Sequence, residues 1–116
     1  MLMASLVLGW QLASASAPGG CFNAAYQFHT AARSAELCRN VGSRFCFDEA
    51  YRFNTLETAA NLCRNVHSDP CMRDSFRFNS LRHAAQVCAH VAPGDCYRVQ
   101  RQHYGIARAA QLCRIQ

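Results

Sequence analysis

The eight cysteines of this chain recur with one fixed period. Successive cysteines are separated by sixteen and seven residues in strict alternation, at Cys21, Cys38, Cys46, Cys63, Cys71, Cys88, Cys96 and Cys113. An internal period of this length is typical of tandem supersecondary units, none of which can bury its apolar face alone. The sequence therefore predicts one domain over residues 21–116, made of four repeats: 21–45, 46–70, 71–95 and 96–116.

Apolar residues within a unit follow helical spacing. In the second unit, steps of three and four residues join Cys46, Ala50, Phe53, Leu56, Ala60 and Cys63. A Thr, Ser or Gly after the middle of each unit predicts the start of a second helix, and Asn54 and Asn79 just before it can take up the left-handed conformation. Asp69 and Asp95 are expected to cap the first helices. One helix of about twenty residues per unit is the alternative.

The cysteines help to choose between these helical arrangements. A continuous helix would hold Cys46 and Cys63 about 25 Å apart, whereas a disulfide requires alpha carbons within roughly 7 Å. A hairpin brings the two cysteines of one unit together. Pairing across the seven-residue gaps suits long helices but leaves Cys21 and Cys113 without partners, so pairing within units is favoured. The predicted fold class is all-α: four tandem 25-residue helical-hairpin repeats, stapled by disulfides and stacked as a short solenoid-like array.

The N-terminal segment resembles an export signal in composition. Residues 1–17 carry no charge, and the apolar stretch from Leu2 to Leu12 precedes a small-residue cleavage site at Ala15. We therefore expect a signal peptide over 1–15 and a short linker over 16–20. An uncleaved membrane anchor is the rival, but the apolar stretch is shorter than the roughly 20 residues of a spanning helix, and no span is predicted in the mature chain. With eight cysteines in 116 residues, the expected location is secreted, either extracellular or periplasmic.

The charge of the chain favours an acidic partner. Twelve arginines and no lysine give a net charge of +5. Residues 96–116 hold four arginines and no acid, whereas residues 46–70 hold two arginines and four acids. We expect a protein or glycan partner, and the candidate contact residues are Arg52, Arg77, Arg98, Arg101 and Arg108. Nucleic acid is not the expected partner, because the aromatic residues beside these arginines recur at helical spacing and are predicted to pack in the core.

No catalytic or metal-binding motif is apparent in the sequence. The cysteines lack the close pairs typical of zinc sites and redox enzymes, and the histidines occupy different positions in the units. All eight cysteines are therefore assigned to disulfides, with no cofactor, no metal and no enzyme activity predicted. The resulting hypothesis is a non-enzymatic binding module that presents a basic helical-repeat surface. A purely structural envelope or matrix component, and a secreted enzyme inhibitor or small enzyme, are the alternatives; the oligomeric state stays open.

Overall fold

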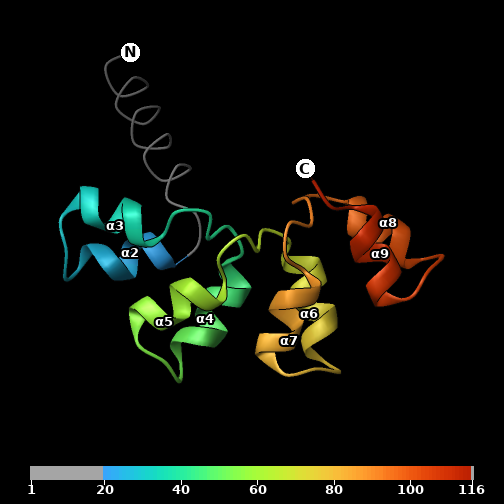
Figure 1. Ribbon diagram of the computed structural model, residues 1–116, viewed down its shortest axis with the longest axis horizontal. Helices are drawn as coiled ribbons and strands as arrows, with labels where there is room; N and C mark the ends of the chain where they lie inside the picture. The colour runs from blue at the N-terminus through green and yellow to red at the C-terminus, as the bar shows by residue number, and fades with distance from the viewer. Residues whose placement is uncertain (1–19, 116) are drawn as a thin grey trace, which may run out of the picture.

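The computed structural model describes residues 20–115, and all regular secondary structure in this part of the chain is helical. The predicted signal peptide over 1–15 and nearly all of the linker lie outside the described residues. The helices run in pairs along the chain: α2 (Cys21–Tyr26) with α3 (Ala31–Leu37), α4 (Arg44–Tyr51) with α5 (Leu56–Leu62), α6 (Asp69–Phe76) with α7 (Leu81–Val87), and α8 (Cys96–Arg101) with α9 (Ile106–Leu112). Each pair forms a hairpin, and neighbouring hairpins are in contact (Figure 1).

The fold-back within the first three units is fixed by a hydroxyl residue just before the second helix, a position that Gly105 occupies in the fourth unit without a side-chain cap. The hydroxyl oxygens of Thr30, Thr55 and Ser80 each accept a hydrogen bond from the backbone N–H three residues later. This N-capping satisfies donors that the first turn of a helix leaves without partners. Two short helices per unit, with a turn between them, are thus confirmed.

The left-handed residues lie in a different place from the one predicted. Among the described non-glycine residues they are Asn40, Asn65 and His90, with φ of 62°, 67° and 66°, in the connectors between hairpins. The expectation for Asn54 and Asn79 was wrong, because the side-chain amide of each donates back to the carbonyl of Ala50 or Ser75 in the preceding helix. Asn is the non-glycine residue that best tolerates this conformation. The sharp reversal of the chain therefore occurs between units as well as within them.

Each hairpin is closed at its open end by one disulfide. The pairs are Cys21–Cys38, Cys46–Cys63, Cys71–Cys88 and Cys96–Cys113, with alpha carbons 5.8 to 5.9 Å apart. This is the pairing within units that the sequence favours over pairing across the gaps. Each bond closes a loop whose contribution to stability is about 3 kcal/mol in the chain-entropy model. Four disulfides in a chain of this size indicate an oxidising environment outside the cytosol.

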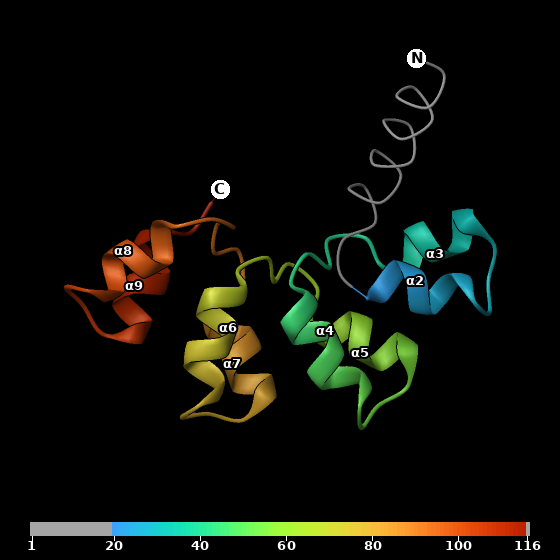
Figure 2. The same cartoon turned by 180° about the vertical axis from the view of Figure 1, so that it is seen from behind.

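The connectors between hairpins are joined by backbone hydrogen bonds that repeat from unit to unit. The N–H of Asn65 donates to the carbonyl of Asn40 at 2.7 Å, that of His90 to Asn65 at 2.8 Å, and that of Ile115 to His90 at 2.8 Å. The connectors run along one side of the molecule, from which the hairpins project (Figure 2). The α4–α5 and α6–α7 turns lie along one edge in both views, while the α2–α3 and α8–α9 turns lie at opposite ends.

Small side chains and cystines make up much of the core. Ala59, Ala84 and Ala109, at one position of successive units, are fully buried, as are most of the cysteines. Larger side chains enter at the position after the first cysteine, where Phe47, Met72 and Tyr97 are at most 2% exposed. Within residues 20–115, none of these short helices has the length and apolar character needed to cross a bilayer.

The prediction that the repeated aromatic residues pack in the core was wrong for five of the six residues, and only Phe76 packs against the core. Phe28, Phe53 and Phe78 are 70%, 84% and 67% exposed. At the other position, Tyr26 and Tyr51 are 58% and 37% exposed. Each still stacks on its predicted partner four residues earlier, Phe22 or Phe47. The exposed phenylalanines lie beyond the last turn of the first helix. They therefore lie on the hairpin turns, where their side chains are exposed to solvent.

Candidate binding groove between α6 and α8

A groove of about 380 Å³ lies between the first helices of the third and fourth hairpins, α6 and α8. The lining residues are Pro70, Arg73, Asp74, Arg77, Tyr97, Arg98, Arg101 and Gln102. The charged part of this lining consists of four arginines and one aspartate, which leaves a net charge of +3. We call this hollow the basic groove.

Helix geometry places the four arginines on the facing sides of the two helices. Arg73 and Arg77 are four residues apart at the C-terminal end of α6, and Arg98 and Arg101 are three residues apart on α8. Residues at these spacings are neighbours on one helix face. Because α6 contacts α8, the two pairs line opposite walls of one groove.

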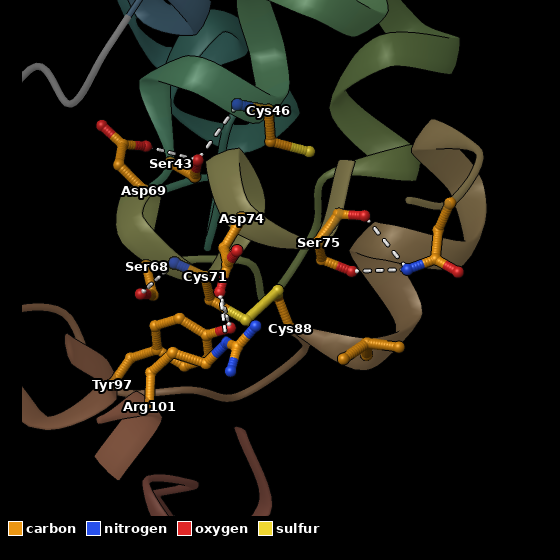
Figure 3. Close-up of a disulfide and its surroundings, with 12 residues drawn as sticks. Ser43, Cys46, Ser68, Asp69, Cys71, Asp74, Ser75, Cys88, Tyr97 and Arg101 are labelled. Atoms are coloured by element: carbon orange, nitrogen blue, oxygen red, sulfur yellow. Dashed lines mark hydrogen bonds and ion pairs between the residues drawn. A yellow bond between two sulfur atoms is a disulfide. The ribbon is translucent and has the colours of Figure 1, made fainter. Parts of the chain in front are cut away.

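Asp74 connects the two walls at the base of the basic groove. Its Oδ2 accepts hydrogen bonds from the Tyr97 hydroxyl at 2.7 Å and from Arg101 Nε at 2.8 Å (Figure 3). Burial raises the pKa of Tyr97 well above its ordinary value, and the hydrogen bond to Asp74 and the carboxylate charge add to the rise. The hydrogen bond to Asp74 likewise raises the pKa of Arg101. The single carboxylate of the groove is therefore already occupied by donors of the protein.

The other three guanidinium groups are held by weaker contacts. The Arg73 Cζ atom lies 4.9 Å from the centre of the Phe45 ring, and Arg77 Cζ lies 5.8 Å from that of Phe78. Arg98 pairs with Asp95 at 3.2 Å, but both side chains are largely exposed, so this ion pair is worth little. These guanidinium groups can turn toward an incoming carboxylate, sulfate or phosphate without leaving a buried charge unpaired.

The start of α6 differs from the sequence-based expectation. The N-cap is Ser68, whose hydroxyl oxygen accepts from the Cys71 N–H, and not Asp69. The Asp69 carboxylate instead reaches the neighbouring hairpin, where it accepts from the Ser43 hydroxyl and from the Phe45 N–H. Figure 3 shows the contact between Asp69 and Ser43. Asp95 is the N-cap of α8 as predicted, although its side chain makes no capping bond.

Three of the five predicted contact arginines meet in the basic groove: Arg77, Arg98 and Arg101. Arg108 lies on α9 with its Cζ 5.9 Å from the centre of the Tyr104 ring, and it does not line the groove. Arg52 lines the neighbouring groove instead. Sequence reasoning missed Arg73, although its position, one full repeat before Arg98, marks it as the equivalent residue of the third unit.

The neighbouring groove, between α4 and α6, is the equivalent hollow one unit earlier. Its volume is about 360 Å³, and its lining residues are Arg44, Phe45, Asp48, Glu49, Arg52, Asp69 and Arg73. Three arginines are balanced by three acids, so its net charge is zero. We call it the neutral groove; Arg73 borders both.

Within residues 20–115, no three His, Cys, Asp or Glu side chains lie close enough to hold a metal ion together. Comparison with known proteins adds no relative: no protein-family model matches the chain, and no curated protein or solved structure shows significant similarity.

Proposed function

We propose that the protein is a secreted, non-enzymatic binding module, extracellular or periplasmic, that holds an acidic group of a protein or glycan partner in the basic groove. The hairpins stack as a short solenoid-like array, and the junction of the third and fourth units carries the ligand. The observation that carries the proposal is the excess of three positive charges in one groove.

Guanidinium groups suit this role because their planar donors match carboxylate, sulfate and phosphate oxygens in paired hydrogen bonds. Asp74 fixes Arg101 in place, while Arg77 and Arg98 stay exposed and accessible. The cystines of the third and fourth hairpins hold both walls of the groove. A site whose walls are held before binding loses less conformational entropy when the ligand arrives.

The test measures retention of the oxidised protein on immobilised heparin and on immobilised poly-L-glutamate. Changing Arg77→Gln and Arg98→Gln together removes two groove charges. We expect roughly tenfold weaker binding to at least one of these polymers, since a charge-assisted hydrogen bond contributes about 1.5 kcal/mol or more and tenfold corresponds to about 1.4 kcal/mol.

A matched control removes the same charge elsewhere. Arg39 follows α3 and Arg82 lies on α7, both exposed and outside the basic groove, so Arg39→Gln with Arg82→Gln should leave binding within about twofold. Equal losses in the two double variants would mean that net charge alone causes retention, and would refute the groove. No retention of the wild-type protein on either polymer would favour a purely structural role.

A further inference from the structure

Three phenylalanines repeat in this protein without any structural reason that the fold supplies. The other repeated side chains have one: the cysteines are bonded, the alanines are buried, the Thr and Ser residues cap helices, and the connector Asn residues are left-handed. Phe28, Phe53 and Phe78 occupy one position in three successive units, yet two thirds or more of each side chain is exposed. Single exposed apolar side chains are common on protein surfaces, but the same exposed ring at one position of three units is a pattern that core packing does not explain.

Two of these phenylalanines lie on the same edge of the molecule. Phe53 belongs to the α4–α5 turn and Phe78 to the α6–α7 turn, and both turns lie along one edge in the two opposite views (Figures 1 and 2). Each follows directly on an exposed arginine, Arg52 or Arg77. We call these four residues the aromatic edge.

The charge around the aromatic edge is positive at the Phe78 tip. Arg77 lies against Phe78, and Arg82 is on the first turn of α7, which contains no acid. The acid nearest in sequence on α6, Asp74, is occupied by Tyr97 and Arg101. At the other tip, Arg52 is 3.8 Å from Glu49, a contact weak enough to be exchanged for another anion. A second acid, Glu57, lies on the first turn of α5, so the Phe78 tip is the more basic of the two. The rings are thus accompanied by cations on long side chains.

We propose that the aromatic edge binds the surface of an anionic lipid bilayer. Phe53 and Phe78 would enter the boundary between headgroups and acyl chains, and Arg52 and Arg77 would extend along the rings to lipid phosphates. A bilayer is favoured over a protein partner because the rings stand on two separate projecting turns. A fluid interface accepts such separate side chains without a complementary pocket for each. The aromatic edge shares Arg77 with the basic groove, but neither phenylalanine lines that groove.

The test is co-sedimentation of the oxidised protein with mixed vesicles, in which phosphatidylcholine and anionic phosphatidylglycerol are present at seven to three, and with vesicles of phosphatidylcholine alone. An ionic strength of about 0.1 M keeps electrostatic attraction short-ranged. We expect binding to the mixed vesicles and at least tenfold weaker binding to the neutral ones. Changing Phe53→Ser and Phe78→Ser together should lower binding to the mixed vesicles at least tenfold. Because both rings are exposed, the fold and the retention on heparin should not change.

The control removes two exposed aromatic rings from the outer hairpins, whose turns lie at opposite ends of the molecule. Phe28→Ser with Tyr104→Ser should keep binding to mixed vesicles within about twofold of wild type. Three results would overturn the proposal: no binding of the wild-type protein to mixed vesicles, equal losses in the two double variants, or full binding by the Phe53→Ser, Phe78→Ser variant. In the last case Arg73→Gln with Arg98→Gln, which changes the basic groove and leaves all four residues of the aromatic edge in place, would show whether the groove alone attracts the anionic surface.

Discussion

The first helices of the second and third hairpins are in contact, as are those of the third and fourth, yet the two junctions differ in charge. A shift of one repeat relates the neutral groove to the basic groove, because α4 and α6 correspond to α6 and α8. Asp48 of the neutral groove corresponds to Arg73 of the basic groove, and Asp69 corresponds to Gly94, which carries no charge and does not line the basic groove. A pair of helices thus provides the hollow, and exposed positions decide what the hollow can bind.

A buried position also differs between the two junctions. The residue that fills the space behind each groove is Met72 in one and Tyr97 in the other, both almost fully buried. The tyrosine adds a hydroxyl that donates to Asp74, whereas the neutral groove has Glu49 at the position of Asp74. The buried hydroxyl of Tyr97 is therefore tolerated because the neighbouring unit offers it an acceptor.

The junctions also differ on the side away from the grooves, where two of them share an arginine contact that the third lacks. At the last junction, Arg114 donates to the carbonyl of Val87 at the end of α7, and at the first, Arg64 donates to that of Leu37 at the end of α3. The middle junction has Ala89 at this position. A hollow of about 190 Å³ lies there, bordered by residues that include Leu62, Arg82 and Ala89. The middle junction therefore lacks a contact that its two neighbours have.

The largest expected effect comes from making the neutral groove basic. Asp48→Arg with Glu49→Gln changes the groove from three arginines and three acids to four arginines and one acid, the charge of the basic groove. We expect a second binding site for a heparin-derived tetrasaccharide, with at least tenfold higher affinity than the wild-type neutral groove. Isothermal titration calorimetry should then report two sites per chain in place of one.

The control for this change is Glu36→Arg with Glu57→Gln. It adds the same charge on α3 and α5, outside both grooves. One site per chain is expected to remain, because a higher net charge attracts the ligand without giving it a place to bind. A second site in the control as well would show that the position of the charge is irrelevant.

A smaller effect is expected from Tyr97→Phe, which removes the hydroxyl that links the last two hairpins. The loss of one buried hydrogen bond to a carboxylate should lower the free energy of unfolding by about 1 to 2 kcal/mol at pH 7. The dependence on pH should change too. Since folding raises the pKa of Tyr97, its contribution is complete below the unfolded value of about 10. It is lost as the pH rises above that value.

Denaturant titrations at pH 7, 9 and 11, with disulfides kept oxidised, test this prediction. The wild-type protein should lose more stability between pH 9 and 11 than Tyr97→Phe does. Tyr104→Phe is the control, because Tyr104 is exposed and lies at the α8–α9 turn; it should follow the wild type. An identical loss at high pH in wild type and Tyr97→Phe would mean that burial and the bond to Asp74 do not raise the pKa of Tyr97 in the folded protein.

The comparison also separates what the sequence predicts well from what it does not. Helical spacing and cysteine parity predict the paired helices and the four disulfides, because both depend on distances along the chain that the period fixes. The hydroxyl caps at Thr30, Thr55 and Ser80 were likewise predictable from local chemistry. Such features require knowledge of one unit only.

Features that depend on contact between units were predicted poorly. Asp69 looks like an N-cap in its own unit but bonds to Ser43 and Phe45 of the previous one. Arg73 has no special place in its helix, and only the packing of α8 against α6 makes it part of the basic groove. Phe53 is exposed because the helix ends before it and the turn begins. The spacing of apolar residues does not predict the end of a helix to within one residue.

The smallest expected effect comes from giving the middle junction its missing arginine. Ala89→Arg should reach the carbonyls at the end of α5, as Arg64 reaches those of Leu37 at 3.2 Å and Arg39 at 2.7 Å. A cation at the C-terminus of a helix contributes about 0.5 kcal/mol. Repulsion from Arg64 and Arg82, which border the same hollow, should keep the gain at this lower end. Thermal unfolding should show a rise of about 2 °C in Tm.

Ala89→Gln is the control, because glutamine fills part of the hollow without a charge, and its Tm should stay within about 1 °C of wild type. Arg64→Ala should lower Tm by at least as much as Ala89→Arg raises it, since two bonds to carbonyls are then lost. If Ala89→Arg were no more stable than Ala89→Gln while Arg64→Ala did lower Tm, the middle junction would differ in backbone geometry and not only in the residue at position 89. In that case the two grooves would be equivalent after a shift of 25 residues, but the sides of the junctions away from the grooves would not.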